Sequence, residues 1–273
     1  ERSHFANSLG WVQRLHRALE QDNFCLFAQA IAPAGGRSRQ FNHFEILLRL
    51  EEDGSITSPA QFIPAAERFG LMPMIDRWVV RKALEIIRQR DPDGLDTYAI
   101  NLSGLTLTDD SFLDYLRSEL DRSGVPPAAL CFELTETSAI ANFDEAILFM
   151  DTMRELGCRF ALDDFGVGMS SLSYLKRLLV DFVKIDGSFV RGMLGDRSDL
   201  LTIEMINRIA HLSGKRTIAE FVETAEPLTA LRGIAVDFVQ GYAIDRPKPF
   251  TGEASVRPAD AEACLDSTAV GLR

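Results

Sequence analysis

Residues 130–164, LCFELTETSAIANFDEAILFMDTMRELGCRFALDD, hold two short apolar runs on either side of one amphipathic helical stretch. The runs, residues 130–135 and 159–163, have the length of buried strands. Asn142-Phe143-Asp144-Glu145, which lies between them, resembles a helix cap. When a helix connects two neighbouring strands of one sheet, the strands run parallel and the connection is a right-handed crossover. This stretch therefore predicts an α/β fold.

The same rhythm extends through most of the chain. Ser58-Pro59-Ala60-Gln61 combines a capping box with Pro at the first helical position and predicts another helix start. From Thr97 onward the strand-helix-strand order is regular, which favours parallel strands. The expected strands cover residues 24–31, 41–50, 97–102, 130–135, 159–163, 182–185, 216–219 and 238–240.

The first two expected strands are connected differently. Only residues 32–40 separate them, and Pro33, Gly35 and Gly36 lie in this short connection. A parallel crossover needs a longer segment, usually a helix. We therefore expect the first two strands to pair as an antiparallel hairpin.

The two ends of the chain differ from the middle. Residues 5–21 have a helical pattern with Trp11, Leu15 and Leu19 on one face, and the sequence begins without Met. We expect a linker helix at residues 1–22 that follows an upstream domain, one barrel domain at residues 23–250, and a polar tail at residues 251–273.

Charge and composition exclude several function classes. The net charge of −11 is unsuited to a protein that binds duplex nucleic acid, which needs a basic surface. The four cysteines form no Cys-x-x-Cys pair and the four histidines show no zinc-ligand spacing, so a metal site would use oxygen ligands and favour magnesium, manganese or calcium. No apolar run reaches the ~20 residues of a membrane span. We expect a cytoplasmic segment without membrane contact, and this expectation leaves room for a membrane anchor elsewhere in the full-length parent.

Polar side chains lie at the ends of seven successive expected strands. Individually, such acidic residues commonly cap the helix that follows. Together they point to a functional site, because strand ends converge at one mouth of a barrel and buried charges are costly unless paired or metal-bound. The residues are Glu45, Asn101, Glu133, Asp163, Asp164, Lys184, Glu220 and Gln240.

The charges of this set predict two divalent cations. Five carboxylates and one ammonium group leave a charge of −4, which two divalent ions would neutralise. Paired metal ions suit in-line attack of water on a phosphodiester. Calcium, with its longer and looser coordination, is expected to inhibit.

A set of short motifs runs along the chain in a definite order. These motifs are Gln29-Ala30-Ile31, Glu45-Ile46-Leu47-Leu48-Arg49, Phe62-Ile63-Pro64, Asn101-Leu102-Ser103, Glu133-Leu134-Thr135-Glu136, Asp163-Asp164-Phe165-Gly166, Ser170-Ser171-Leu172, Lys184-Ile185-Asp186, Ala219-Glu220-Phe221-Val222-Glu223 and Gln240-Gly241-Tyr242. In this order they resemble the motifs of the EAL domain family of cyclic di-GMP phosphodiesterases, where Glu-Ala-Leu-Leu-Arg stands in the place of the second motif.

The resemblance implies a modified TIM (β/α)8 barrel that hydrolyses cyclic di-GMP to linear pGpG with two magnesium or manganese ions. It also implies a homodimer and an upstream sensory or GGDEF-type domain. In this assignment Lys184, Glu220 and Glu45 are the catalytic residues. Lys184 positions the attacking water, and Glu136 braces the loop 164–171. The implied metal ligands are Glu45, Asn101, Glu133, Asp163, Asp164 and Glu220, and the implied substrate-binding residues are Gln29, Leu48, Arg49 and Gln240.

Three positions depart from the family pattern. Ile46 replaces Ala, Ala30 replaces a common Pro, and Phe221 replaces a Gly usual between the two glutamates. We interpret Ile46 as packing on the strand face opposite Glu45. For Phe221, core packing is the first interpretation and a stacking surface for guanine is the second.

Two other functions fit parts of the pattern. A cyclic di-GMP receptor would keep the fold without the reaction, although it would not need a complete ligand set. An aldolase would use Lys184 as a Schiff-base lysine, which must be deprotonated near neutral pH. The surrounding carboxylates oppose that deprotonation.

Overall fold

The computed structural model describes residues 2–36, 42–167 and 172–252, and eight of its strands pair into a closed barrel at its centre. The α/β barrel predicted from the sequence is confirmed. The barrel strands are β1 (Phe24–Pro33), β2 (His43–Glu52), β4 (Thr97–Asn101), β5 (Leu130–Thr135), β6 (Arg159–Phe165), β7 (Phe182–Ile185), β8 (Arg216–Ala219) and β9 (Phe238–Gln240).

Strand β1 closes the barrel and runs against its neighbours. It pairs antiparallel with β2 and with β9, whereas the other barrel pairs are parallel. The expected hairpin between the first two strands is therefore confirmed. Its register places Gln29 opposite Glu45, and Ile31 lies opposite Gln240. The reversed strand thus brings an N-terminal glutamine beside the residues at the ends of the parallel strands.

Inside the barrel, an apolar layer lies directly beneath the polar strand-end residues. It consists of Ile31, Ala99, Cys131, Ala161, Phe182 and Ile218, with Phe238 packed against it. Five members of this layer are followed two positions later by a strand-end residue, as Ala99 is by Asn101 and Phe182 by Lys184, and Phe238 is followed in the same way by Gln240. Alternate residues of a strand point to the same face, so the two layers stack. The apolar layer closes the barrel below the site.

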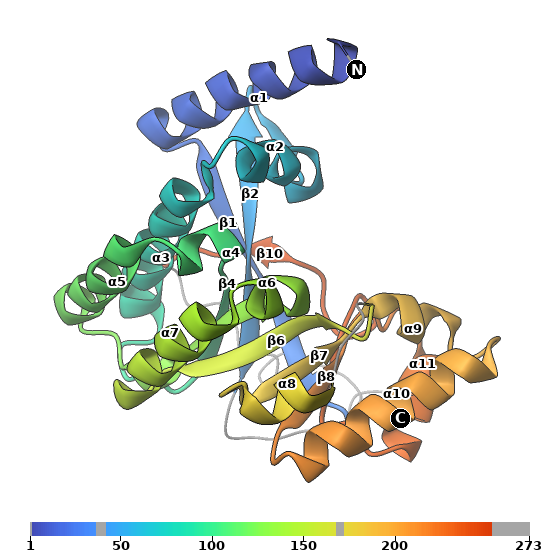
Figure 1. Ribbon diagram of the computed structural model, residues 1–273. Coiled ribbons are helices and arrows are strands. Elements are labelled where there is room, and N and C mark those ends of the chain that lie inside the picture. Colours follow the sequence, from blue (N-terminus) through green and yellow to red (C-terminus); the bar gives the residue numbers. More distant parts are fainter. Residues whose placement is uncertain (1, 37–41, 168–171, 253–273) are drawn as a thin grey trace, which may run out of the picture.

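Helices lie around the barrel strands (Figure 1). Each helix contributes at least one buried side chain to the main core. Helix α5, for example, begins after Asp109, whose side chain accepts from Ser111 N, and ends at the left-handed Gly124. The helices are α1 (Arg2–Gln21), α2 (Ile63–Arg68), α3 (Met72–Arg90), α4 (Gly104–Leu107), α5 (Asp110–Ser123), α6 (Glu136–Ala141), α7 (Phe143–Glu155), α8 (Leu172–Arg177), α9 (Gly187–Gly192), α10 (Arg197–Leu212) and α11 (Ala225–Gly233). Two 3-10 turns, η1 (Pro59–Gln61) and η2 (Pro127–Ala129), and two short strands, β3 (Ser55–Thr57) and β10 (Lys248–Pro249), complete the described elements.

The two helix starts predicted from capping motifs differ in detail from those in the structure. Ser58 precedes only the 3-10 turn η1 and makes no side-chain cap bond; the α-helix starts at Ile63, with Pro64 in its first turn. Asn142 does precede α7, but its amide donates to the Ser138 carbonyl of the preceding helix α6. The side chain of Asn142 therefore joins two helices instead of capping the second.

The second half of α1 packs on the domain. Leu15 and Ala18 are buried in the main core, and Trp11 lies 6.1 Å from Phe62 between ring centroids. In the described part of the chain, none of the helices has both the length and the apolar character needed to cross a membrane.

Candidate active site

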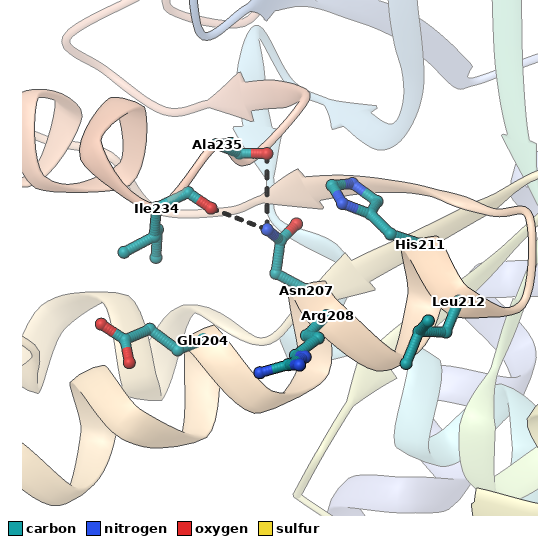
Figure 2. Close-up of a pocket in the computed structure, with 7 residues that line it drawn as sticks. All are labelled: Glu204, Asn207, Arg208, His211, Leu212, Ile234 and Ala235. Atoms are coloured by element: carbon teal, nitrogen blue, oxygen red, sulfur yellow. Dashed lines mark hydrogen bonds between the residues drawn. The ribbon is translucent and has the colours of Figure 1, made fainter.

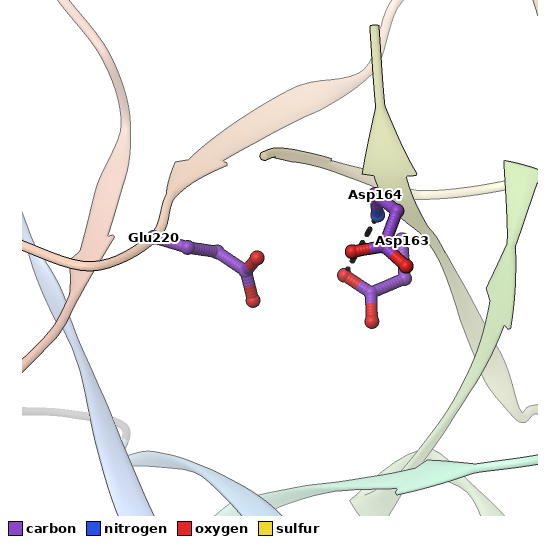
Figure 3. Close-up of side chains that lie close together, drawn as sticks. All are labelled: Asp163, Asp164 and Glu220. Atoms are coloured by element: carbon purple, nitrogen blue, oxygen red, sulfur yellow. Dashed lines mark hydrogen bonds between the residues drawn. The ribbon is translucent and has the colours of Figure 1, made fainter. Parts of the chain in front are cut away.

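The polar strand-end residues meet at the C-terminal mouth of the barrel. Glu45 comes from β2, Asn101 from β4, Glu133 from β5 and Lys184 from β7. Asp163 and Asp164 lie in β6, Glu220 follows β8, and Gln240 ends β9. Figure 3 shows the side chain of Glu220 pointing across the mouth toward the two aspartates.

Lys184 lies at the centre of this cluster and is completely buried. Its Nζ is 2.8 Å from Glu133 Oε2, 2.9 Å from Glu220 Oε1, 3.1 Å from Asp163 Oδ1 and 3.5 Å from Glu45 Oε2. Burial lowers the pKa of Lys184, but the four carboxylates outweigh burial and raise that pKa well above its ordinary value. The ammonium group therefore stays protonated.

Three side-chain amides orient Glu45 and one another. Asn101 Nδ2 donates to Glu45 Oε1 at 2.8 Å, and Gln240 Nε2 donates to Glu45 Oε2 at 2.7 Å. Gln240 Nε2 also reaches Gln29 Oε1 at 3.1 Å, while Gln29 Nε2 donates to the Asp245 carbonyl at 2.9 Å. Burial raises the pKa of Glu45, but Lys184 and the amides of Gln240 and Asn101 outweigh burial and bring the pKa below its ordinary value. Glu45 is therefore ionised.

Asp163, Asp164 and Glu220 form the part of the cluster best suited to a cation. Each can offer one carboxylate oxygen, and these oxygens lie within 4.8 Å of one another. Burial, followed by repulsion from Asp163, raises the pKa of Asp164 to about 6. Burial is also the main cause that raises the pKa of Glu220 to about 8, with Asp163 and Glu45 adding to it. A divalent cation would relieve both effects.

Glu133 adds a second indication that a cation fits here. This residue is fully buried, and only Oε2 is bonded, to Lys184. Oε1 has no hydrogen-bond partner among the described residues. Burial raises the pKa of Glu133 well above its ordinary value. An unpartnered buried carboxylate oxygen in an all-oxygen donor set suits a hard cation such as magnesium.

Glu136 lies outside the ligand cluster and contacts the segment after the aspartates. It begins α6, where Thr135 is the N-cap, and is buried. Its Oε2 accepts from the backbone N–H of Gly166 at 3.1 Å. This contact is the kind expected of a brace for the loop that begins at Asp164. Residues 168–171 of that loop lie outside the described residues.

A pocket of about 340 Å³ opens above the cluster. Leu47 lines it together with Arg49, whose guanidinium carbon is 5.6 Å from the Phe27 ring. Leu48, expected at the substrate from the sequence, does not line this pocket and packs against the core instead. Side chains alternate along β2, so Leu47 shares the face of Glu45 and Leu48 does not. The other lining residues are Gln29, Glu45, Asp163, Asp164, Glu220, Phe221, Glu223, Gln240, Gly241, Tyr242 and Pro247.

The two substitutions interpreted as packing have different environments. Ile46 is buried in the core, as expected. The first interpretation of Phe221 is wrong, because this residue is 49% exposed and lines the pocket. Tyr242, for which the motifs imply no role, lines the same pocket, and the Arg246 guanidinium lies 4.5 Å from its ring centroid.

A second pocket lies apart from the carboxylate cluster, between α10 and the residues after α11 (Figure 2). At its base Asn207 Nδ2 donates to the carbonyl of Ile234 at 2.8 Å and to that of Ala235 at 3.4 Å. Both contacts hold a helix to a connecting segment. None of the strand-end residues predicted from the sequence lines this pocket.

Comparison with known proteins gives one consistent result. The sequence model of the EAL domain family matches residues 12–247. The chain is 40% identical to the cyclic di-GMP phosphodiesterase PdeB of Shewanella oneidensis over 89% of this chain and 28% of that protein. It is 34% identical to the cyclic di-GMP phosphodiesterase PdeF of Escherichia coli over 89% of this chain and 32% of that protein. The chain thus spans about a third or less of these relatives.

A solved structure agrees with these relatives. The phosphodiesterase PaMucR in complex with cyclic di-GMP superposes with a TM-score of 0.81 at 30% identity, over 88% of this chain and 98% of that one.

Proposed function

The chain belongs to the EAL domain family, and we propose that its barrel hydrolyses cyclic di-GMP to linear pGpG in a metal-dependent reaction. The observation that carries the proposal is the buried carboxylate cluster around Lys184 at the floor of an open pocket. The relatives named as cyclic di-GMP phosphodiesterases and the PaMucR complex support the choice of substrate.

Two magnesium or manganese ions would balance the charge of the cluster. The residues proposed to hold them are Glu45, Asn101, Glu133, Asp163, Asp164 and Glu220. When bound, such ions supply Lewis acidity toward the phosphate and make water more acidic. The unpartnered oxygen of Glu133 and the convergence of Asp163, Asp164 and Glu220 support this assignment.

The remaining polar groups of the chain would act on the nucleophile and the substrate. Lys184, held protonated beside Glu220, would donate a hydrogen bond that orients the attacking water. Arg49 at the pocket wall would bind a substrate phosphate, since a guanidinium matches phosphate geometry. Gln240 would keep Glu45 oriented through the hydrogen bond that its side-chain amide donates to Glu45 Oε2.

Two alternatives receive less support. The raised pKa of Lys184 opposes Schiff-base chemistry, because that reaction needs a neutral amine. A receptor that binds cyclic di-GMP without cleaving it would not require the complete carboxylate set seen around Lys184.

We propose the wider organisation on the same family membership. It comprises a linker helix at residues 1–22, a catalytic barrel at 23–250 and a tail at 251–273, with an upstream sensory or GGDEF-type domain. We further propose a cytoplasmic homodimer in which Glu136 couples the loop 164–171 to the metal site.

The test is incubation of the protein with cyclic di-GMP and magnesium, followed by chromatography of the nucleotides. The wild type is expected to consume the substrate, and Glu45→Gln to lose consumption. Glu51→Gln, an exposed glutamate on the same strand, is the matched control and should remain active. Binding by the wild type without consumption would favour the receptor.

A further inference from the structure

The backbone at Phe221 is in a conformation that favours glycine. Its φ is +54°, in the left-handed region where a side chain with a Cβ is strained. The EAL resemblance places a glycine at this position between two glutamates. The chain therefore keeps a large aromatic residue where the backbone favours the smallest one. Such strain persists when the surroundings hold it and is frequently connected with function.

The ring is fixed by two neighbours from α9. Gly187 leaves space for it, since a Cβ built on Gly187 would overlap the Phe221 side chain. The guanidinium of Arg191 lies 4.5 Å from the ring centroid, within the range of a cation–π contact. Phe221 is thus held in place although it is not a core residue.

The Phe221 side chain lies at the pocket and not in the core. Phe221 follows Glu220 directly, lines the pocket with Arg49 and Tyr242, and is 49% exposed. An exposed aromatic that is preoriented beside a polar cluster provides a flat apolar surface for a planar ligand group. Purine bases are such groups, and stacking on aromatic side chains is a common way of binding them.

We propose that Phe221, supported by Gly187 and Arg191, is a stacking platform for one guanine of the substrate and determines affinity for it. This inference rests on the proposed function, because the purine comes from the cyclic dinucleotide. The residue acts on binding and takes no part in the bond cleavage.

Three variants test the platform through the separate values of KM and kcat for cyclic di-GMP at saturating magnesium. Phe221→Leu keeps the Cβ and the backbone strain but removes the aromatic face, so KM should rise about 5-fold or more with little change in kcat. Phe221→Trp should keep the low KM, because the indole also stacks.

Phe221→Gly separates stacking from structural packing. Glycine removes the platform and relieves the positive φ, so KM should rise while Tm is equal to or higher than that of the wild type. A packing role predicts the opposite shift in Tm. The magnesium concentration for half-maximal activity should be unchanged in Phe221→Leu, which distinguishes lost stacking from a displaced Glu220.

The results that overturn the platform differ from those that overturn the proposed function. An active wild type with an unchanged KM in Phe221→Leu refutes the platform alone. The platform is also refuted if KM of Phe221→Leu is raised at low magnesium but returns to the wild-type value when more magnesium is added, because that result indicates a displaced Glu220. A wild type that neither binds nor consumes cyclic di-GMP refutes both.

Discussion

Replacing Lys184 by Met removes the ammonium group at the centre of the carboxylate cluster. The methionine side chain has a similar length but no charge. Four carboxylates, which now lie 2.8–3.5 Å from Nζ, would then share a buried site without that cation. Glu133 would lose its one hydrogen-bond donor among the described residues. Without metal, Lys184→Met should therefore be much less stable than the wild type.

The expected loss can be estimated from the burial of the cluster. Removing one partner of a buried ion pair costs about 3–5 kcal/mol, because the other charge stays buried and uncompensated. With an m-value of roughly 3 kcal/mol per M, the midpoint of urea unfolding in EDTA should fall by about 1–2 M. Magnesium should restore much of the loss, because it binds the folded state and supplies the missing positive charge.

Lys215→Met is the matched control. Lys215 is also buried, but its Nζ donates to the carbonyls of Leu178 and Val180 at 2.8 and 3.2 Å. This variant should be destabilised, and magnesium should stabilise it only as much as it stabilises the wild type, so that its deficit relative to the wild type remains. Turnover by Lys184→Met should fall about 100-fold or more even with magnesium, since the group acting on the nucleophile is lost.

The assay is urea unfolding of both variants and the wild type, in EDTA and in magnesium. Equal stability of Lys184→Met and wild type in EDTA would refute the electrostatic account of the cluster. If magnesium reduced the deficit relative to wild type equally in both lysine variants, its effect would not come from replacing the charge of Lys184.

Three further predictions concern metals, the brace and pH. Activity should require magnesium or manganese and be inhibited by calcium; full activity after exhaustive chelation would exclude the metal mechanism. Glu136→Gln should raise the magnesium concentration for half-maximal activity about 10–100-fold, because it weakens the bond to Gly166, and a metal titration identical to wild type would contradict this. Burial raises the pKa of Asp76 from 3.8 to about 6, more than the bonds from Thr106 and Ser103 lower it. As the pH rises, the Asp76 carboxyl ionises in the unfolded chain before it ionises in the folded chain. Between pH 4 and 7 the unfolding free energy of the wild type should therefore fall by up to about 3 kcal/mol relative to that of Asp76→Asn. Parallel pH profiles of the two proteins would disprove the raised pKa.

Much of the fold was predictable because buried strands appear as short apolar runs. Strands β5, β7, β8 and β9 have the predicted bounds, and β1 is longer by two residues. Strands β3 and β10 were missed because three-residue and two-residue strands carry no periodic signal. Asn142 was misread as a cap because its preference for Ser138 depends on how α6 and α7 meet.

The convergence of the site residues was predictable. Side chains alternate between the two faces of a strand, and the carboxyl ends of parallel barrel strands meet at one end of the barrel, so the sequence indicates which side chains lie together there. This alternation also argues for Leu47 in the pocket, whereas Leu48 was taken from the family signature. The bond from Gln29 to the Asp245 carbonyl could not be foreseen, because it joins β1 to a segment 216 residues away. The exposure of Phe221 likewise depends on the turn after β8 and on the space left by Gly187.

Hydrolysis of cyclic di-GMP in oxygen-18 water with magnesium tests the central proposal most directly. Direct attack of water on one phosphodiester predicts linear pGpG with a single oxygen-18 atom in its new terminal phosphate. Unlabelled product, accumulation of GMP without a linear intermediate, or bound but uncleaved cyclic di-GMP would contradict the proposal.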